Sequence, residues 1–316
     1  MNRWLLAVAL LAALPFPALG KTYRVKKVGE LPNFVAVSPE GDTAYVTSFG
    51  TGELIEVDLN RRRVVRSLVV GSSPLGVVLD DTGKTAYVTC RESGTVAVVD
   101  IPSFRVAANI VVGGAPVGIA LGPRGYRAFV TNFGRTKEGI LHIIELRDRS
   151  VLANIRMGLS PIAIAVSPVD EMVYVVNGGS DEVWVVNPDR QSVVSKIQVG
   201  EAPDGIAITP DGSRIFVANS RSNDLTVIDA KSRTVLVSIP VGKSPFGVAV
   251  SPDGKRVFVV NTGSRSVSIL PVDLSTLQAK IVQVDKGPVD VVVLPNSRVI
   301  VVVNEQSHTL SIAEVP

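Results

Sequence analysis

The stretch from Gly242 to Asn261, GKSPFGVAVSPDGKRVFVVN, contains the unit that decides the fold. A Gly-x-x-Pro tetrapeptide leads into a short apolar run, which ends at the turn Ser251-Pro-Asp-Gly254. A second run, Phe258-Val-Val-Asn261, combines an aromatic residue with two valines. Short runs of this kind, bounded by Gly, Pro and Asp, are typical of β-strands separated by tight turns. The stretch therefore predicts two short strands joined by a turn.

This unit recurs along the whole chain. Seven prolines mark its copies: Pro32, Pro74, Pro116, Pro161, Pro203, Pro245 and Pro288. Neighbouring prolines are 42 to 45 residues apart, and each copy except the last continues into a third and a fourth predicted strand. A unit of about 42 residues with four strands has the size of one propeller blade. No helical periodicity is present after residue 20, so we predict an all-β protein.

The two ends of the chain together supply one more complete unit. The last copy, residues 288–316, has 29 residues and stops after its third strand, whereas residues 21–31 match a fourth strand and its Gly-x-x-Pro sequence. A solenoid would instead need distinct caps at both ends. We therefore predict a single domain, residues 21–316, that is a seven-bladed β-propeller with four-stranded blades. Its ring is closed by the N-terminal strand, so one blade is split between 21–31 and 288–316.

The strand sequences also resemble a known family. Phe129-Val-Thr-Asn132 and the alternating Thr95-Val-Ala-Val-Val-Asp100 are similar to the repeats of YVTN-repeat seven-bladed β-propellers, which include YncE-like exported proteins. The resemblance covers residues 21–316 and implies the fold. It implies no single activity, because such propellers serve as binding platforms, enzyme subunits and surface-layer repeats. Members also occur as accessory partners of redox enzymes.

The first twenty residues have the features of a secretory signal peptide. Arg3 precedes an apolar run from Trp4 to Leu14, and the segment ends on the small residues Ala18 and Gly20. The run is short for a membrane span. We predict cleavage after Gly20, no membrane span in the mature chain, and a periplasmic or extracellular location. The alternative is an uncleaved N-terminal anchor.

Composition excludes several chemistries. One cysteine cannot form an internal disulfide or a Cys-based zinc site, and two histidines and three methionines make haem and copper centres poor candidates. No Gly-x-Ser-x-Gly or His-Glu-x-x-His motif is present. We therefore expect a non-catalytic, monomeric binding scaffold with no evident cofactor. The alternatives are a hydrolase or lactonase-type enzyme that uses channel carboxylates, and an accessory subunit of a periplasmic redox enzyme.

Polar residues directly after the repeat prolines indicate a site at the mouth of the central channel. Asn33 and Asp204 follow their prolines, where most copies have an apolar residue. Asp290 and Phe34 stand one position further on, where the other copies have glycine or alanine. We predict that Asn33, Asp204 and Asp290 contact a small ligand there. Because calcium prefers oxygen ligands, Asp204 and Asp290 are also candidates for a divalent-cation site.

Loops on the same face supply further candidates. We include His308 and three arginines as ligand-binding residues: Arg91, Arg221 and Arg265. The predicted loop face has 12 acidic and 7 basic residues, a balance that argues against a nucleic-acid groove. We expect a small ligand or a protein partner instead. The blade-three loop Gly134–Gly139, which is longer than its counterparts, is a further candidate.

Overall fold

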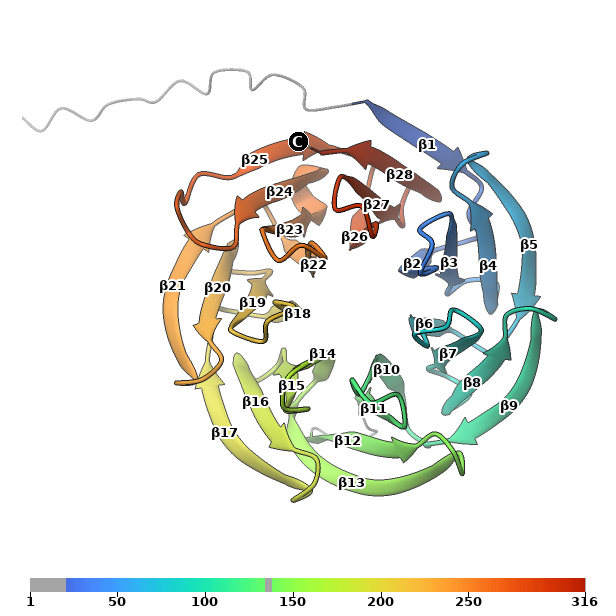
Figure 1. The fold of residues 1–316 in the computed structure, drawn as a ribbon, viewed down its shortest axis with the longest axis horizontal. Coiled ribbons are helices and arrows are strands. Elements are labelled where there is room, and N and C mark those ends of the chain that lie inside the picture. Colours follow the sequence, from blue (N-terminus) through green and yellow to red (C-terminus); the bar gives the residue numbers. More distant parts are fainter. Residues whose placement is uncertain (1–20, 134–137, 316) are drawn as a thin grey trace, which may run out of the picture.

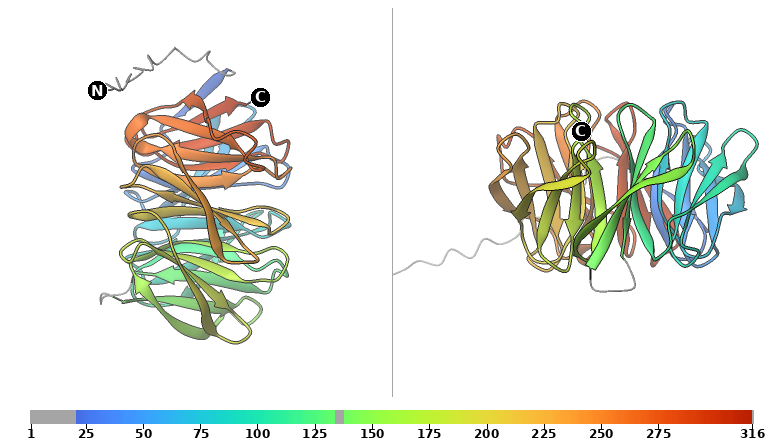
Figure 2. Two further views of the ribbon diagram at one scale, coloured as in Figure 1. Left: turned by 90° about the vertical axis from the view of Figure 1, so that its left-hand side faces the viewer. Right: turned by 90° about the horizontal axis from the view of Figure 1, so that it is seen from below.

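Each sequence repeat folds into one four-stranded antiparallel sheet, and seven such sheets surround a central channel (Figure 1). The structure is a computed structural model that describes residues 21–133 and 138–315. The predicted signal peptide, residues 1–20, and most of the blade-three loop, residues 134–137, lie outside the described residues. Seen from its edge, the ring is a disc with loops on two opposite faces (Figure 2). The predicted all-β, seven-bladed fold is confirmed.

In six blades the strands run in chain order from the channel outward, and in the split blade β1 is the outermost strand. The innermost strands are β2 (Pro32–Val37), β6 (Pro74–Leu79), β10 (Pro116–Leu121), β14 (Pro161–Val166), β18 (Pro203–Ile208), β22 (Pro245–Val250) and β26 (Pro288–Val293). The second strands are β3 (Thr43–Ser48), β7 (Thr85–Cys90), β11 (Arg127–Asn132), β15 (Val173–Asn177), β19 (Arg214–Asn219), β23 (Arg256–Asn261) and β27 (Val299–Asn304).

The third strands are β4 (Glu53–Asp58), β8 (Thr95–Asp100), β12 (Glu138–Glu145), β16 (Glu182–Asn187), β20 (Asp224–Asp229), β24 (Ser266–Pro271) and β28 (Thr309–Glu314). The outermost strands are β5 (Arg63–Val69), β9 (Arg105–Val111), β13 (Ser150–Leu159), β17 (Ser192–Gln198), β21 (Thr234–Pro240), β25 (Lys280–Gln283) and β1 (Thr22–Lys26). A 3-10 turn, η1 (Thr262–Ser264), follows β23. In the described part of the chain, no helix is long and apolar enough to cross a membrane.

The N-terminal strand closes the ring. β1 pairs antiparallel with β28, so that Val25 lies opposite Leu310, and the backbone N–H of Val28 donates to the carbonyl of His308 at 3.1 Å. Val25 and Val28 are buried at 2% and 0% exposure. The strand therefore covers the open edge of β28 and adds to the core between the last blade and the first.

Threonines of the second strands connect neighbouring blades. The hydroxyl of Thr89 donates to the carbonyl of Val117 in the next blade at 2.6 Å, and Thr131 donates in the same way to Ile162 at 2.7 Å. Both threonines are fully buried. Since a buried hydroxyl is costly without a partner, the threonine of the repeat has a structural reason to recur.

Two of the five asparagines that end second strands hold the loop before their own blade. The other three, Asn177, Asn219 and Asn304, donate to groups on the strands of their own blade. Asn132 accepts a hydrogen bond from the backbone of Ala115 at 2.8 Å and donates to the carbonyl of Gly113 at 2.7 Å. Asn261 accepts from the backbone N–H of Gly242 at 3.0 Å. These side chains are buried, so they stabilise the loops from within and are not available to a ligand.

The small residues on the inner strands are explained by close contact between blades. A Cβ atom on Gly205 would lie 2.0 Å from the carbonyl oxygen of Phe246, and one on Gly118 would lie 2.4 Å from that of Ile162. Backbone atoms at this distance cannot give way without moving a whole strand. A larger residue at this position therefore needs a different arrangement of the neighbouring blade.

Candidate functional site: the central channel

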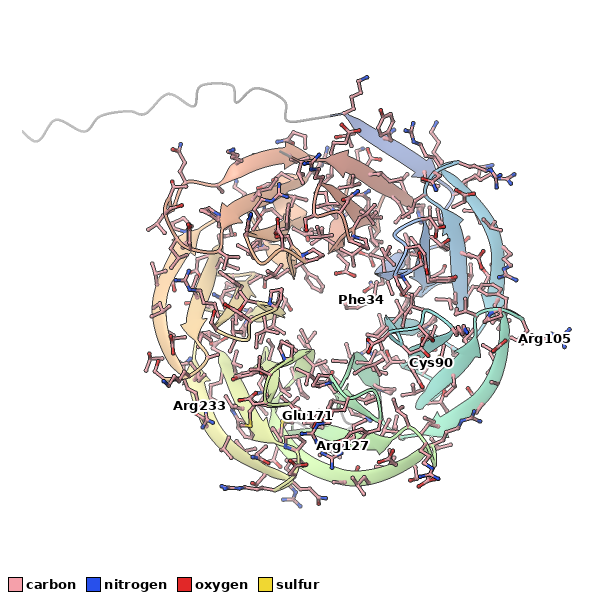
Figure 3. The ribbon with its side chains drawn as sticks, in the orientation of Figure 1. Phe34, Cys90, Arg105, Arg127, Glu171 and Arg233 are labelled. Carbon is pink, nitrogen blue, oxygen red and sulfur yellow. The ribbon has the colours of Figure 1, made fainter. Side chains whose placement is uncertain are left out.

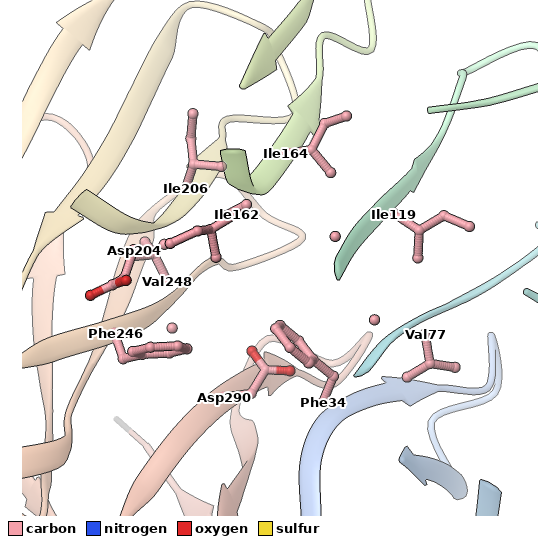
Figure 4. Close-up of a pocket in the computed structure, with 15 residues that line it drawn as sticks. Phe34, Val77, Ile119, Ile162, Ile164, Asp204, Ile206, Phe246, Val248 and Asp290 are labelled. Atoms are coloured by element: carbon pink, nitrogen blue, oxygen red, sulfur yellow. The ribbon is translucent and has the colours of Figure 1, made fainter. Parts of the chain in front are cut away.

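The inner strands enclose a cavity of about 160 Å³ in the channel (Figure 4). Apolar side chains and glycines form most of its wall, and Asp204 and Asp290 are its two titratable residues. Phe34 points towards the centre of the ring, whereas Arg105 and Arg233 lie at its outer rim (Figure 3). A concave, mostly apolar site with few polar groups is typical of small-molecule binding.

Asp290 has a structural reason to stand where other blades have glycine or alanine. Its Oδ2 accepts a hydrogen bond from the backbone N–H of Val35, at 3.0 Å, across the boundary between blades seven and one. The aspartate thus fills the space between two inner strands and pairs a backbone group there. Burial raises the pKa of this carboxyl to about 7, against the opposing effect of hydrogen bonds from the Val35 and Val291 backbone. Near neutral pH, a single proton therefore changes the charge of the channel.

Asp204 is the second carboxyl of the cavity. It lies on β18, directly after Pro203, and is partly buried. Burial raises its pKa, and a hydrogen bond with Ser220 opposes that effect. Both channel carboxyls are thus less easily ionised than exposed ones, which is the usual result of a low-dielectric environment.

Two aromatic rings accompany the carboxyls. Phe34 on β2 and Phe246 on β22 both line the cavity, and their rings extend into it from opposite sides of Asp290 (Figure 4). Phe246 occupies the same repeat position as Asp204. In the sequence, Phe34 is unusual only because other copies have a small residue at its position. Phe246 is not unusual, because an apolar residue after the proline is normal in this repeat.

The other predicted site residues lie elsewhere. Asn33 is partly exposed and does not line the cavity. Arg91, Arg221 and Arg265 are exposed on the loop face and do not line it either. The Arg91 guanidinium lies 5.8 Å from the ring centre of Phe133 in the next blade. The structure therefore brings Asp204 and Asp290 together with two phenylalanines, but not with the arginines.

His308 belongs to a second depression, which lies where the two ends of the chain meet. Its Nδ1 is 3.2 Å from the carbonyl oxygen of Gly29 and 3.4 Å from the backbone nitrogen of Leu31, so the ring contacts the N-terminal segment. The depression has a volume of about 560 Å³, and we call it the seam groove. Its walls are formed by Arg24, Lys26, Lys27, Asp285, Lys286, Gln306, Ser307, His308 and Thr309.

Within residues 21–133 and 138–315, no three His, Cys, Asp or Glu side chains gather in a group that could hold a metal ion. The cavity offers two carboxyl side chains, whereas calcium takes six to eight oxygen ligands. The calcium site at Asp204 and Asp290 stays a prediction from the sequence.

Comparison with known proteins agrees with the fold. Residues 150–314 match the model of the YNCE-like beta-propeller family. The chain belongs to this family. Among solved structures, it is similar to a chain of Kuenenia stuttgartiensis Hydrazine Synthase, with a TM-score of 0.83 and 22% identity over 92% of this chain and 97% of that chain. That similarity shows the propeller fold alone. No curated protein matches the sequence.

Proposed function

We propose that this YNCE-like propeller is an exported, monomeric and non-catalytic binding protein that holds a small organic cation in its central channel. One observation carries the proposal: the rings of Phe34 and Phe246 extend into the same channel cavity as the carboxyl of Asp290. Aromatic faces attract cations, and a nearby carboxylate adds a direct charge interaction.

The size of the cavity fits such a ligand. Its volume of about 160 Å³ is close to that of an engineered protein cavity of about 150 Å³ that binds benzene. A quaternary or primary ammonium with a few carbon atoms has a similar size. The apolar wall would contact its methyl or methylene groups, which a bare metal ion does not have.

The pH dependence of binding follows from Asp290. Apart from Asp204, no other residue of the cavity wall is titratable, so no lysine or arginine from the adjoining strands neutralises the carboxylate there. A cation binds better to the ionised form, which predominates above the pKa of about 7. Affinity should therefore increase as the pH rises through this value, and binding should release protons from the protein.

Choline and its neutral isostere 3,3-dimethyl-1-butanol test the proposal by calorimetric titration at pH 6 and pH 8.5. We expect choline to bind more tightly than the alcohol, and more tightly at the higher pH. Asp290→Asn and Phe34→Leu should each weaken choline binding. Asp273→Asn, a change at an exposed aspartate outside the cavity, is the matched control.

Three results would contradict the proposal: equal binding of choline and the alcohol, an equal loss in Asp273→Asn, or binding of neither compound. Calcium is included in the same titrations. Calcium binding that is lost when Asp204 and Asp290 are both changed to asparagine would support the metal site predicted from the sequence instead. Export is tested separately, by the mass of the secreted protein, which should begin at Lys21.

A further inference from the structure

We propose that the seam groove binds an oxyanion of the phosphate type. This site is distinct from the channel and does not depend on the proposed channel ligand. It lies on the loop face. There, the end of β1 and the residue after it meet two loops, one before β26 and one after β27. Its walls therefore come from the two ends of the chain.

The charge of the groove is strongly positive. Lys26, Lys27 and Lys286 are exposed, and none of the three forms an ion pair within the described residues. The groove has one acidic residue, Asp285, whose carboxylate already pairs with Arg24 and accepts a hydrogen bond from the Thr309 hydroxyl at 2.9 Å. Three ammonium groups thus face the groove without a counter-charge.

The remaining walls hold the lysines in place and add one amide donor. The Ser307 hydroxyl donates to the carbonyl oxygen of Lys286 at 3.2 Å and lies 3.0 Å from the hydroxyl of Thr309, and Gln306 adds its side-chain amide. Ammonium and amide N–H groups donate to phosphate oxygens, and the bonds from the ammonium groups are charge-assisted. The combination favours an oxyanion over an apolar ligand or a cation.

The position of the groove links binding to ring closure. Lys26 ends the N-terminal strand, Lys27 follows it, and Lys286 lies in the loop before β26. An anion held between them would reduce the repulsion among these ammonium groups and tie the N-terminal strand to the last blade. Because unfolding separates the two ends of the chain, a bound anion should stabilise the folded protein.

The test is a thermal-shift titration of the full mature protein with pyrophosphate, with sodium chloride added to keep the ionic strength constant. We expect the melting temperature to rise by about 5 °C at a hundredfold excess over Kd. The variant K26Q/K27Q/K286Q should lose this rise. The matched control K231Q/K255Q/K280Q removes the same charge from exposed sites outside the groove and should keep the rise.

No rise in the wild-type protein, or an equal loss in both triple variants, would overturn the proposal. A second arm identifies the source of the phosphate group. Co-sedimentation with phosphatidylglycerol vesicles but not with phosphatidylcholine vesicles, lost in K26Q/K27Q/K286Q, would assign the groove to a lipid headgroup. A pyrophosphate effect without vesicle binding would assign it to a soluble phosphate.

Discussion

Replacing Asp290 by asparagine should stabilise the protein above pH 7, although it changes a residue that pairs with the next blade. Asparagine has almost the same size, and its side-chain oxygen can still accept the hydrogen bond from Val35. The substitution removes a carboxyl group that has to ionise in a buried position. The carboxyl has a pKa of about 7 in the folded protein, compared with an ordinary value of 3.8.

The direction in which the stability changes with pH follows from proton binding to Asp290. Between pH 4 and pH 7 the folded protein keeps a proton on Asp290 that the unfolded chain has lost, so the contribution of this residue to stability falls as the pH rises, and it is constant above pH 7. At 1.36 kcal/mol for each pKa unit, the full loss is about 4 kcal/mol. Since the carboxyl is partly exposed to the channel, we expect about half of it, or about 2 kcal/mol.

The assay is thermal unfolding of the wild-type protein and Asp290→Asn from pH 4 to pH 8.5. The difference in melting temperature should be close to zero at pH 4 and grow to about 3 °C in favour of the variant above pH 7. Other carboxyls titrate equally in both proteins and cancel in the difference. A difference that does not change with pH, or a less stable variant at pH 8.5, would refute this account of Asp290.

Four further predictions concern the scaffold. Deleting residues 21–31 should lower solubility and the melting temperature, because it uncovers β28 and removes Val25 and Val28 from the core; an unchanged melting temperature would contradict the ring closure. Gly205→Ala should destabilise the protein by about 2 to 4 kcal/mol in denaturant titration, since its Cβ would collide with the next blade. The thiol of Cys90 is buried, and burial raises its pKa to about 11, so it should react with a thiol reagent only after unfolding. Gel-shift titration at physiological salt should show no micromolar affinity for nucleic acid, because one groove with three unpaired lysines neutralises few phosphates.

The fold could be predicted because each blade is specified locally. Each blade is encoded by about 42 consecutive residues. Within them lie the repeat proline, a turn such as Ser-Pro-Asp-Gly, and a strand that combines an aromatic residue with valines. Even ring closure needed only the lengths of the two terminal segments and the match of residues 21–31 to a fourth strand. The contacts of the recurrent threonine and asparagine were not needed for that prediction.

The site could be predicted only in part, because it depends on distances between blades. Asn33 and Asp204 occupy the same repeat position and looked equivalent, yet Asp204 lines the cavity and Asn33 does not. Phe246 gave no signal, since an apolar residue is normal after the proline. The count of acidic and basic residues on the loop face also omitted Lys26 and Lys27, which belong to that face only once β1 has paired with β28.

Several irregular residues of both proposed sites lie on blades seven and one. Asp290 is on blade seven and Phe34 on blade one in the channel, and His308 and Lys27 belong to the split blade seven in the seam groove. The other inner strands are held to small residues by the backbone of the next blade, as at Gly205. Where blade seven meets blade one, the hydrogen bond from Val35 to Asp290 allows a larger side chain in that position. An inner strand can therefore carry a side chain in place of glycine where that side chain pairs with the backbone of the next blade, which gives a physical reason for Asp290 to line the channel.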